Sequence, residues 1–402
     1  MTADDPRRSR VLLATRLFVP EVSAGSFRLG ALAEGLVARG AEVDVVTTRP
    51  PRALRGRTVR LPGVRIRRWP VLRDAGGNVR GYIQYLSFDA PLALRLIGAR
   101  ADVIVAEAPP TTGLVAAVVA RLRRRPLAYY AADVWTDGVV SMGAPRVVAG
   151  LMRVMERAAL RASAVVLSVS PEVTERLVVL GAERDRIATI GNGIDTTVFS
   201  PDVEPHSPGR PYFVYTGTMS EWQRPDVFVR AFARIADRHP DVDLRFFGQG
   251  ALQSDLRALA ERAVPGRVHF GGVVPPSDSA RWIRGALAAM VSIAPGVGYD
   301  FARPTKTYAA AACGTPVLFA GAPTGRDLVT TAGLGEGVGF EEDQVAAAME
   351  RLIAQHRSGA TEAHRTGRSA WARENVSLAA AGQRAADAVL GAIADRHERN
   401  AT

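Results

Sequence analysis

Short apolar runs alternate with longer amphipathic segments through the first half of the chain. The runs cover residues 10–14, 42–47, 102–106, 127–132 and 164–169, and the helical patterns between them cover residues 26–39, 112–124, 145–160 and 171–180. Runs of this length are too short for helices and are typical of strands that are buried on both faces. Strands that alternate with helices predict a parallel sheet with helices on both of its faces.

The alternation stops at residues 201–209, where three prolines and a glycine occur without periodicity and indicate an interdomain linker. It then restarts, with strands expected at residues 212–215, 243–247, 267–270, 288–293 and 317–319 and helices at 225–238, 251–263, 276–284, 305–312 and 343–355. The sequence therefore predicts two Rossmann-like, doubly wound α/β domains, residues 1–200 and 210–402, that face each other across a ligand cleft. A last helix is expected at about residues 369–394.

Composition narrows the class of protein. Hydrophobic residues make up 47% of the 402 residues and charged residues 23%, as in soluble globular proteins. No apolar run reaches the ~18 residues of a transmembrane helix, and the polar start of the chain does not resemble a secretory signal. A single cysteine, Cys313, excludes an intramolecular disulfide and a zinc cluster built on cysteines. We therefore expect a cytoplasmic protein.

Positive charge is concentrated in the first half of the chain. Residues 1–200 hold 29 arginines against 18 acidic residues, whereas residues 201–402 hold 22 basic and 22 acidic residues. Nine arginines lie between Arg49 and Arg73 with no acid among them, and four more lie between Arg121 and Arg125. Such a surface suits anionic lipid, nucleic acid or an anionic substrate, or is simply a solvated face. Nucleic acid is the least suitable partner, because Trp69 is the sole aromatic residue in the longer run.

Lys306 is the only lysine among 51 basic residues. Lysine offers a compact ammonium where arginine offers a wide planar fork, so a close contact to one phosphate oxygen favours lysine. Pro304 suits the first turn of a helix, and Thr305, Lys306 and Thr307 then lie where backbone N–H groups have no partner within the helix. Lysine and helix N-terminus together predict a diphosphate site, although the survival of one lysine by chance is the alternative.

Three further positions are candidates for chemistry. Asp133 follows the expected strand at residues 127–132, where a carboxylate can orient an acceptor hydroxyl or take its proton, or act as a turn residue. Gly25 precedes a helix whose N-terminus attracts a phosphate, and this segment lacks the GxGxxG pattern of a dinucleotide site. Gly250 allows a ligand to approach the backbone after the strand at residues 243–247, or forms a tight turn.

These motifs and several others together resemble the family 4 glycosyltransferases of the GT-B fold over nearly the whole chain. The segments that carry the resemblance are Gly191-Asn192-Gly193-Ile194-Asp195 with Phe199-Ser200-Pro201, Tyr215-Thr216-Gly217, Phe247-Gly248-Gln249-Gly250, Pro304-Thr305-Lys306 and Ala312-Cys313-Gly314-Thr315-Pro316-Val317. The resemblance implies transfer of a sugar from a nucleotide diphosphate sugar with retention of configuration and without an obligatory metal. It places the acceptor in the first domain and the donor in the second, and it returns the final helix to the first domain.

The resemblance assigns a role to each candidate residue. Asp133 is expected to be catalytic, Arg28 and Trp135 to bind the acceptor, and the donor to contact Gly25, Arg224, Gly250, Thr305, Lys306 and Thr307. Two glutamates found in many members are replaced here by Phe301 and Ala309, so the donor nucleotide cannot be assigned, and Ala132 stands where a histidine is frequent.

The Pro-Thr-Lys form resembles a subgroup that acts on envelope polysaccharide intermediates. We therefore expect a glycan or lipid-linked acceptor at the inner face of the plasma membrane, held there by the arginines, with Trp69 or Tyr82–Leu86 entering the interface. A nucleotide-sugar 2-epimerase and an inactive nucleotide-sugar binding protein are the alternatives.

Overall fold

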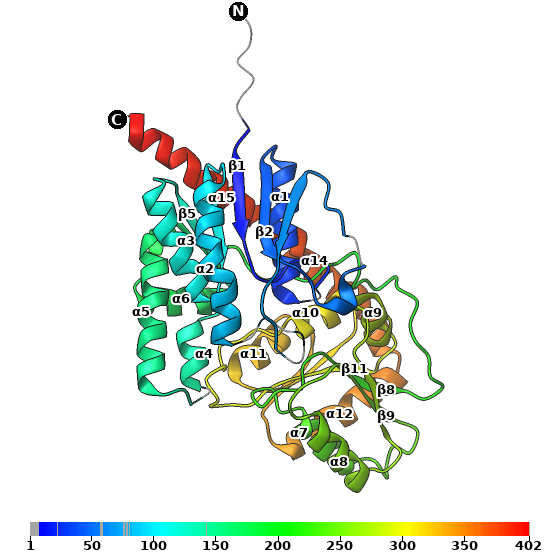
Figure 1. The fold of residues 1–402 in the computed structure, drawn as a ribbon. Helices are drawn as coiled ribbons and strands as arrows, with labels where there is room; N and C mark the ends of the chain where they lie inside the picture. Colours follow the sequence, from blue (N-terminus) through cyan, green and yellow to red (C-terminus); the bar gives the residue numbers. More distant parts are fainter. Residues whose placement is uncertain are drawn as a thin grey trace, which may run out of the picture. The chain divides into compact units, whose positions relative to one another are not determined.

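The computed structural model describes residues 8–21, 23–56, 59–74, 77, 79, 81–141 and 143–401, and in this part of the chain no helix is long and apolar enough to cross a membrane. The chain divides into two compact units (Figure 1). Unit 1 comprises Met1–Asn192 and Leu378–Thr402, and unit 2 comprises Gly193–Ser377. The sequence placed the division between residues 200 and 210, whereas the contacts divide the chain after residue 192 and again after residue 377.

Unit 1 is built on a parallel sheet in which seven strands of the described chain follow the order β3-β2-β1-β4-β5-β6-β7. The strands are β1 (Arg10–Ala14), β2 (Glu42–Thr48), β3 (Val64–Trp69), β4 (Val103–Glu107), β5 (Leu127–Ala131), β6 (Val165–Ser168) and β7 (Ile187–Thr189). β1, β4 and β5 lie in the middle and are almost wholly buried, because they carry apolar residues toward both faces. This confirms the predicted doubly wound sheet.

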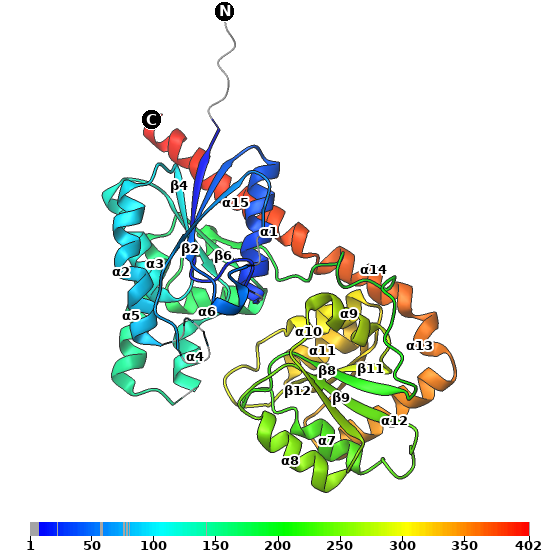
Figure 2. The same cartoon turned by 45° about the vertical axis from the view of Figure 1, so that its right-hand side comes forward.

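Helices cover both faces of this sheet. They are α1 (Ala24–Ala38), α2 (Tyr82–Gly98), α3 (Pro110–Leu122), α4 (Trp135–Ser141), α5 (Arg146–Ala162), α6 (Pro171–Leu180) and α15 (Leu378–Ala401), with short 3-10 turns η1 (Arg52–Leu54) and η2 (Arg184–Arg186). α2, α3 and α5 pack side by side on one face, and α1 packs against α15 on the other (Figure 2).

Two glycines bring α1 and α15 into close contact. A Cβ at Gly35 would lie 2.8 Å from the carbonyl oxygen of Gly382, and a Cβ at Gly382 would lie 2.4 Å from that of Ala31. Any larger side chain at either position would therefore force the helices apart. Next to this contact Arg39 pairs with Asp387 through two hydrogen bonds, one of them 2.6 Å long. The last helix is thus part of unit 1.

Unit 2 has the same architecture. Six strands of the described chain form a parallel sheet in the order β10-β9-β8-β11-β12-β13. The elements are β8 (Tyr212–Thr216), α7 (Asp226–Ala233), β9 (Asp243–Phe247), α8 (Gln253–Ala263), β10 (Val268–Gly272), α9 (Pro276–Arg284), β11 (Ala288–Ile293), α10 (Thr305–Ala312), β12 (Val317–Gly321), α11 (Pro323–Thr331), β13 (Gly335–Val338), α12 (Glu342–Arg357), α13 (Ala360–Ala363) and α14 (Arg365–Asn375).

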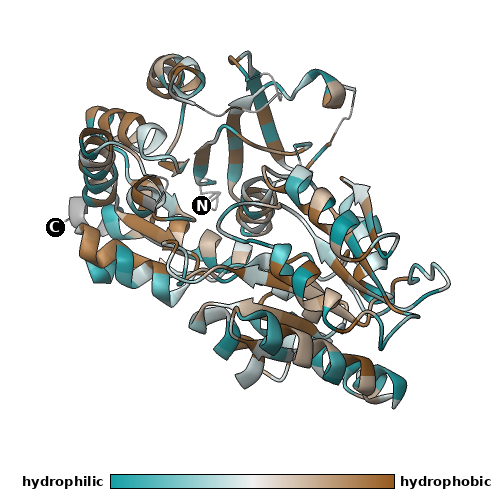
Figure 3. Cartoon of the chain, turned by 90° about the horizontal axis from the view of Figure 1, so that it is seen from below, coloured by the Kyte–Doolittle hydropathy of each residue, from teal (hydrophilic) through white to brown (hydrophobic). Residues whose placement is uncertain are grey.

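Each face of the unit 2 sheet has its own apolar core. Phe228, Phe232 and Met349 lie in the core under α7 and α12, whereas Cys313 lies in the core under α9, α10 and α14. Burial raises the pKa of the Cys313 thiol to about 12, so the thiol stays protonated and acts in packing. The helices combine apolar and polar residues on one ribbon, as expected when a single face is buried (Figure 3).

Several elements differ from the sequence-based expectation. β3 lies within the arginine run, where Arg65 and Arg67 alternate with half-buried Val64 and Ile66, so the charges concealed an edge strand. α2, α11 and β13 were not predicted; Pro91 lies inside α2 and weakened its helical pattern. The expected helix at about residues 369–394 is two helices, α14 and α15. They separate where the carbonyl oxygen of Val376 accepts the Ile194 N–H at 2.9 Å.

Candidate functional site

Lys306 lies in the first turn of α10, at the carboxyl-terminal end of the unit 2 sheet. Pro304 is the N-cap residue, and among the described residues no side chain caps this helix end. The first backbone N–H groups of α10 therefore remain available to an anion, and the helix dipole favours negative charge there. The side chain of Lys306 extends toward the turn that follows β8. This turn contains Gly217, where an added Cβ would lie 3.1 Å from Lys306 Nζ.

Gln223 and Tyr215 contact the Lys306 ammonium. The buried amide of Gln223 accepts from Lys306 Nζ at 2.9 Å and donates to the Tyr215 hydroxyl at 2.9 Å. The ammonium also lies 5.0 Å from the centre of the Tyr215 ring. Lys306 is partly buried, and desolvation lowers the pKa of its ammonium to about 7. Its charge state is therefore sensitive to a bound anion near neutral pH.

Glycines lie opposite Lys306, so this side of the site consists of backbone atoms. Gly217 and Gly248 have φ angles of 116° and 124°, which favour glycine, and a Cβ at Gly248 would collide with the carbonyl oxygen of Gly217 at 1.9 Å. At Gly250 the close neighbour is the chain itself, because an added Cβ would lie 2.2 Å from the Met219 carbonyl oxygen. Gly250 therefore serves the packing of two loops, which the sequence could not distinguish from room for a ligand.

The other donor-binding candidates of unit 2 have different positions. Thr305 is half-buried beside Lys306 in the first turn, whereas Thr307 is buried and its N–H donates to the Pro304 carbonyl at 3.0 Å. Arg224 directly follows Gln223, has a left-handed backbone with φ of 46°, and donates to Asp226 at 3.0 Å. The structure thus brings Thr305 together with Lys306, and it directs the Arg224 guanidinium to Asp226.

Aromatic residues occupy the region where many relatives carry glutamates. Trp222 stacks on Tyr299 with 4.9 Å between ring centres, and Tyr299 stacks on Phe301 at 6.5 Å. The Trp222 carbonyl accepts from the Ala294 N–H at 2.9 Å, which joins this stack to the end of β11. Ala309 is buried in the core beneath α10. An aromatic stack therefore lies near this strand end, and it includes Phe301, one of the two positions where the resemblance led us to expect a glutamate.

In unit 1, Asp133 lies directly after β5 and shares its surroundings with Arg28 and Glu107. The Asp133 side chain is exposed, yet desolvation by the surrounding protein raises the pKa of its carboxyl while the Arg28 charge opposes this shift. Glu107 ends β4 and accepts from the Thr15 hydroxyl at 2.8 Å. Arg28 Nη2 lies 3.8 Å from Glu107 Oε1. Two carboxyl groups with raised pKa values therefore lie around one guanidinium.

Glu107 also explains Gly25. A Cβ at Gly25 would lie 2.8 Å from Glu107 Oε1, so the glycine allows this carboxylate to approach the N-terminus of α1. Burial raises the pKa of Glu107, and the Arg28 charge opposes that shift. The sequence predicted a phosphate at this helix end, but the structure places the chain's own carboxylate next to it.

Trp135 belongs to a second group of unit 1, formed with Arg16 and Tyr85. The Arg16 guanidinium lies 3.9 Å above the Tyr85 ring, and Tyr85 meets Trp135 edge to face with 6.2 Å between ring centres. Glu156, buried in α5, accepts from the Trp135 N–H at 2.9 Å and from the Thr136 N–H at 2.8 Å. This carboxylate therefore holds the start of α4, and with it the segment from Asp133 to Trp135.

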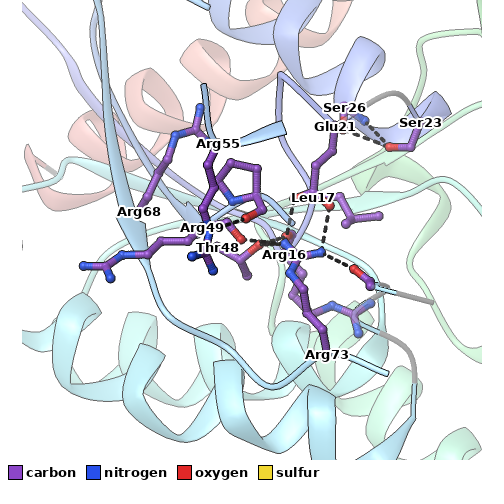
Figure 4. A network of polar contacts seen from close by, with 12 residues as sticks. Arg16, Leu17, Glu21, Ser23, Ser26, Thr48, Arg49, Arg55, Arg68 and Arg73 are labelled. Atoms are coloured by element: carbon purple, nitrogen blue, oxygen red, sulfur yellow. Dashed lines mark hydrogen bonds and ion pairs between the residues drawn. The ribbon is translucent and has the colours of Figure 1, made fainter. Parts of the chain in front are cut away.

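Several arginines of unit 1 keep N–H groups without a partner in the described part of the chain. They are Nε and Nη1 of Arg16, Nε of Arg28 and Nη1 of Arg68, each with almost no accessible surface at the atom. Figure 4 shows the network in which the Thr48 hydroxyl donates to the Arg16 carbonyl at 2.8 Å and accepts from Arg73 at 3.0 Å. Arg16 is 9% exposed, and burial lowers the pKa of its guanidinium. Buried charged donors without acceptors are costly, so Arg16 and Arg28, whose charges both act on Glu107, are suited to an anionic ligand.

The arginine run is partly neutralised inside the chain. Arg73 forms two 2.9 Å hydrogen bonds with the Glu21 carboxylate, and Arg65 and Arg67 both pair with Asp44 at 2.8 and 3.0 Å. Arg68 donates to the Val19 carbonyl at 2.5 Å. Arg57 lies outside the described residues. The run is therefore not a uniform basic face, because several members belong to the interior of the site.

Sequence reasoning missed Glu107, Arg16 and Gln223. The strand-end rule that selected Asp133 applies equally to Glu107 at the end of β4 and to Arg16 just after β1, so their positions carried a usable signal. Gln223 had no such signal, because its contact with Lys306 depends on the path of the loop after β8.

Among the described residues no group of three His, Cys, Asp or Glu side chains could hold a metal ion.

Two sequence families match the chain, one in each half. The Glycosyl transferase 4-like domain matches residues 25–193, and the glycosyl transferases group 1 domain matches residues 210–355. Among curated proteins, the D-inositol 3-phosphate glycosyltransferase of Arthrobacter sp. (strain FB24) is 30% identical over 170 residues, which are 39% of this chain and 39% of that relative. The chain therefore aligns with about two fifths of the length of this relative.

Solved structures agree with the fold. WaaG, a glycosyltransferase involved in lipopolysaccharide biosynthesis, matches with a TM-score of 0.72 and 17% identity, covering 95% of this chain and 100% of that chain. Anabaena Alr3699/HepE in complex with UDP and glucose matches with a TM-score of 0.68 and 15% identity, covering 96% of this chain and 100% of that chain. At such identities these matches show the shared GT-B fold.

Proposed function

The chain belongs to the family 4 glycosyltransferases of the GT-B fold, and we propose that it moves a sugar from a nucleotide diphosphate sugar to an acceptor hydroxyl with retention of configuration. The observation that carries the proposal is the position of Lys306 at the open N-terminus of α10, across from the glycine-lined turn at Gly217. An ammonium, free N–H groups and a positive helix end are three features that stabilise a diphosphate.

In the proposed reaction the bond between the anomeric carbon and the diphosphate oxygen breaks, and a bond from the same carbon to the acceptor oxygen forms. The products are a nucleoside diphosphate, the glycoside and the proton of the acceptor hydroxyl. Lys306 and the α10 N-terminus offset the charge that develops on the leaving diphosphate, and we propose that no metal is obligatory. Transfer that continues in the presence of a chelator is the expected result.

Asp133 is the proposed catalytic group of unit 1. Its carboxylate orients the acceptor hydroxyl or takes its proton, and the raised pKa of Asp133 makes it a better proton acceptor than an ordinary aspartate. The Arg28 charge opposes the rise in the pKa of this carboxyl, and Glu156 positions the segment that carries it. Asp133→Asn is expected to retain donor binding and to lower kcat/KM for the acceptor.

We propose that the acceptor carries a phosphate group. The support is the set of buried guanidinium N–H groups on Arg16 and Arg28, which have no acceptor among the described residues and belong to side chains whose charges both act on Glu107. A phosphorylated acceptor also agrees with the curated relatives, which are D-inositol 3-phosphate glycosyltransferases. A small sugar or cyclitol phosphate and a lipid-linked diphosphate sugar share this chemistry.

The function is tested by thermal-shift measurements with UDP, GDP, dTDP and ADP and their sugars, followed by product analysis. A ligand at 100 times its Kd adds about 2.7 kcal/mol to stability, which such a measurement detects. With the donor identified, transfer is assayed with cyclitol and sugar phosphates and with lipid-linked sugar diphosphates. A changed sugar without any acceptor would indicate a 2-epimerase instead. Donor binding without transfer or hydrolysis would indicate an inactive binding protein.

For a lipid-linked acceptor, we propose that the face formed by α2, α3 and α5 contacts an anionic membrane. Apolar side chains are exposed along one side of α2, at Ile83, Leu86, Leu94 and Ile97, and others are exposed on the neighbouring helices, at Val118, Leu122, Val147, Leu151 and Val154. Arginines accompany them: Arg95 lies over the partly exposed Trp69 ring at 4.3 Å, and Arg121–Arg125 follow on α3. Exposed apolar residues beside basic residues are typical of interfacial helices.

Vesicle sedimentation tests this surface. Binding to anionic vesicles at low salt that weakens as salt rises supports it, because exposed charges are screened. Equal and negligible binding to neutral and anionic vesicles would favour a water-soluble acceptor.

A further inference from the structure

A second polar pocket lies within unit 2, away from Lys306. Its volume is about 250 Å³, and it forms where residues 205–207 meet the end of α9 and the helices α12, α13 and α14. α10 separates the two places: Lys306 lies in its first turn, whereas Cys313, just after its last turn, contacts a residue of the pocket wall. At 1.5 Å per residue, the eight residues of α10 span about 12 Å.

Two arginines supply most of the charge in this pocket. The Arg365 side chain is 9% exposed and donates to the Cys313 carbonyl at 3.1 Å, and the Arg284 side chain is 21% exposed and donates to the Pro201 carbonyl at 2.7 Å. Burial and the nearby Arg365 charge lower the pKa of Arg284, with Glu362 and Asp202 acting in the opposite direction. The two guanidinium groups therefore repel each other in a partly dehydrated space.

A third arginine, Arg368, does not line the pocket, but its charge adds to the repulsion at Arg365. Arg368 donates to the Gly314 carbonyl at 2.9 Å and to the Thr361 carbonyl at 2.5 Å, and burial and Arg365 lower its pKa to about 10. Together Arg365 and Arg368 hold the carbonyl groups at the C-terminal end of α10, which is the helix end that favours positive charge. These backbone carbonyls therefore fix the positions of the Arg365 and Arg368 guanidinium groups.

Glu362 is the acidic residue that lines the pocket and pairs with both arginines. It lies 2.8 Å from Arg365 and 3.6 Å from Arg284, yet its side chain is 65% exposed. Ion pairs that involve such an exposed carboxylate are screened by water and contribute little to stability. An incoming anion can therefore replace Glu362 at little cost, while the arginines stay in place.

Thr361 supplies an unused hydrogen-bonding group. It is 5% exposed and lines the pocket, and its hydroxyl has no partner in the described part of the chain. Buried hydroxyl groups normally have a hydrogen-bond partner, and a buried hydroxyl without one destabilises the fold. A bound oxyanion would accept from this hydroxyl.

We propose that this pocket binds a phosphate group, as inorganic phosphate or as the phosphomonoester of a small molecule. Guanidinium forks fit the tetrahedral oxygens, and the Thr361 hydroxyl donates to a further one. The volume lies below the ~300–1,000 Å³ of pockets for drug-sized ligands, which favours a small ligand. The site is independent of the donor site and therefore of the proposed transferase reaction.

Calorimetric titration of the full chain with inorganic phosphate and with a small phosphomonoester, at constant ionic strength, tests the proposal. We expect Arg284→Gln and Thr361→Val each to weaken binding, by about tenfold for the arginine, and Glu362→Gln to tighten it. Lys306→Ala should leave the same binding unchanged. Glu350→Gln is the matched control. Glu350 lies on α12, forms an ion pair with Arg238 at 2.8 Å, and does not line the pocket.

The result distinguishes sources as well as sites. Tighter binding of the ester points to a phosphorylated small molecule, and equal binding points to free phosphate; both support the site. The proposal is overturned if neither probe binds, if Lys306→Ala abolishes binding, or if Arg284→Gln and Thr361→Val both bind as the unchanged chain does. An equal gain in Glu362→Gln and Glu350→Gln would attribute that effect to net charge and also contradict it.

Discussion

The proposed anion site of unit 2 contains one ammonium, whereas that of unit 1 contains several guanidinium groups. The Lys306 ammonium has two neighbours before any ligand arrives, because it donates a hydrogen bond to Gln223 and lies 5.0 Å from the centre of the Tyr215 ring. In unit 1, Arg16 is buried and Arg68 is half-buried, and each has N–H groups that no described residue accepts. The ammonium of the first site therefore already has one hydrogen-bond partner and, through its lowered pKa, loses its charge readily, while the guanidinium groups of the second gain acceptors only when a ligand binds. This contrast suits a diphosphate common to all donors and a more specific acceptor.

The largest effect is expected from Lys306→Ala. Loss of a charge-assisted hydrogen bond costs about 1.5–3 kcal/mol, so donor affinity should fall about 10- to 100-fold and most turnover should disappear. Donor titration and transfer assays measure this effect. Lys306→Arg should also be impaired, because the compact wall at Gly217 leaves little room for a planar fork. Transfer by Lys306→Ala at the unchanged rate would refute the donor site.

Stability provides the control for that variant. Between about pH 7 and 10.5 the folded chain binds fewer protons at Lys306 than the unfolded chain, so the contribution of this lysine to stability rises with pH in that window. The shift corresponds to about 5 kcal/mol at most, and partial exposure reduces it. Lys306→Met should therefore melt at a higher temperature near pH 7 while it loses activity.

Arg16→Gln should have the next largest effect, and it acts on the acceptor. Removal of the guanidinium above Tyr85 is expected to lower kcat/KM for a phosphorylated acceptor about tenfold or more and to leave donor binding unchanged. Arg100→Gln, at an exposed position after α2, is the matched control. If an acceptor without phosphate loses the same activity, Arg16 supports the fold of the site and does not bind phosphate.

The two sites should respond to pH in opposite directions. Donor binding requires Lys306 to be protonated, so kcat/KM should fall as pH rises through about 7, about tenfold by pH 8. Asp133 must be ionised, so the rate should also fall as pH decreases through its raised pKa. A pH–rate profile measures both limbs. Lys306→Arg should remove the alkaline limb, and a profile in which that limb persists would assign it to another group.

The smallest effect is expected on the membrane-facing helices. Leu94→Asp on α2 should lower sedimentation with anionic vesicles several-fold and leave transfer to a water-soluble acceptor unchanged. Val273→Asp, an exposed apolar position of unit 2, is the control for added negative charge. Equal loss in both variants would mean that net charge, and not this helix face, determines attachment.

Much of the fold was predictable because its central strands are fully apolar. β1 was predicted with its observed bounds, and the paired two-unit architecture followed from the repeated alternation. β3 was not, because an edge strand with outward arginines resembles a solvated charge run. The division of the final helix depends on Ile194, a residue distant in sequence that pairs with its break.

The candidate sites were predictable only in part. Asp133 follows a strand of the unit 1 sheet and Lys306 begins a helix that follows a strand of the unit 2 sheet, so each lies at the carboxyl-terminal end of its own sheet. Whether a glycine makes room for a ligand or for the chain itself depends on tertiary contacts, as Gly25 and Gly250 show. Glu107 and Gln223 act through such contacts, so their roles emerge only when the loops are placed.

The single lysine has a consequence for covalent chemistry. Amine reagents attack the neutral amine, and a pKa of about 7 leaves a large share of Lys306 in that form at neutral pH. The chain offers no other lysine to compete, and the α-amino group is the sole alternative target. Mild acylation should therefore place one label beside the proposed diphosphate site, and a lysine-specific protease would cut the chain once, next to it. A bound donor should slow that labelling, which turns the amine into a direct reporter of occupancy.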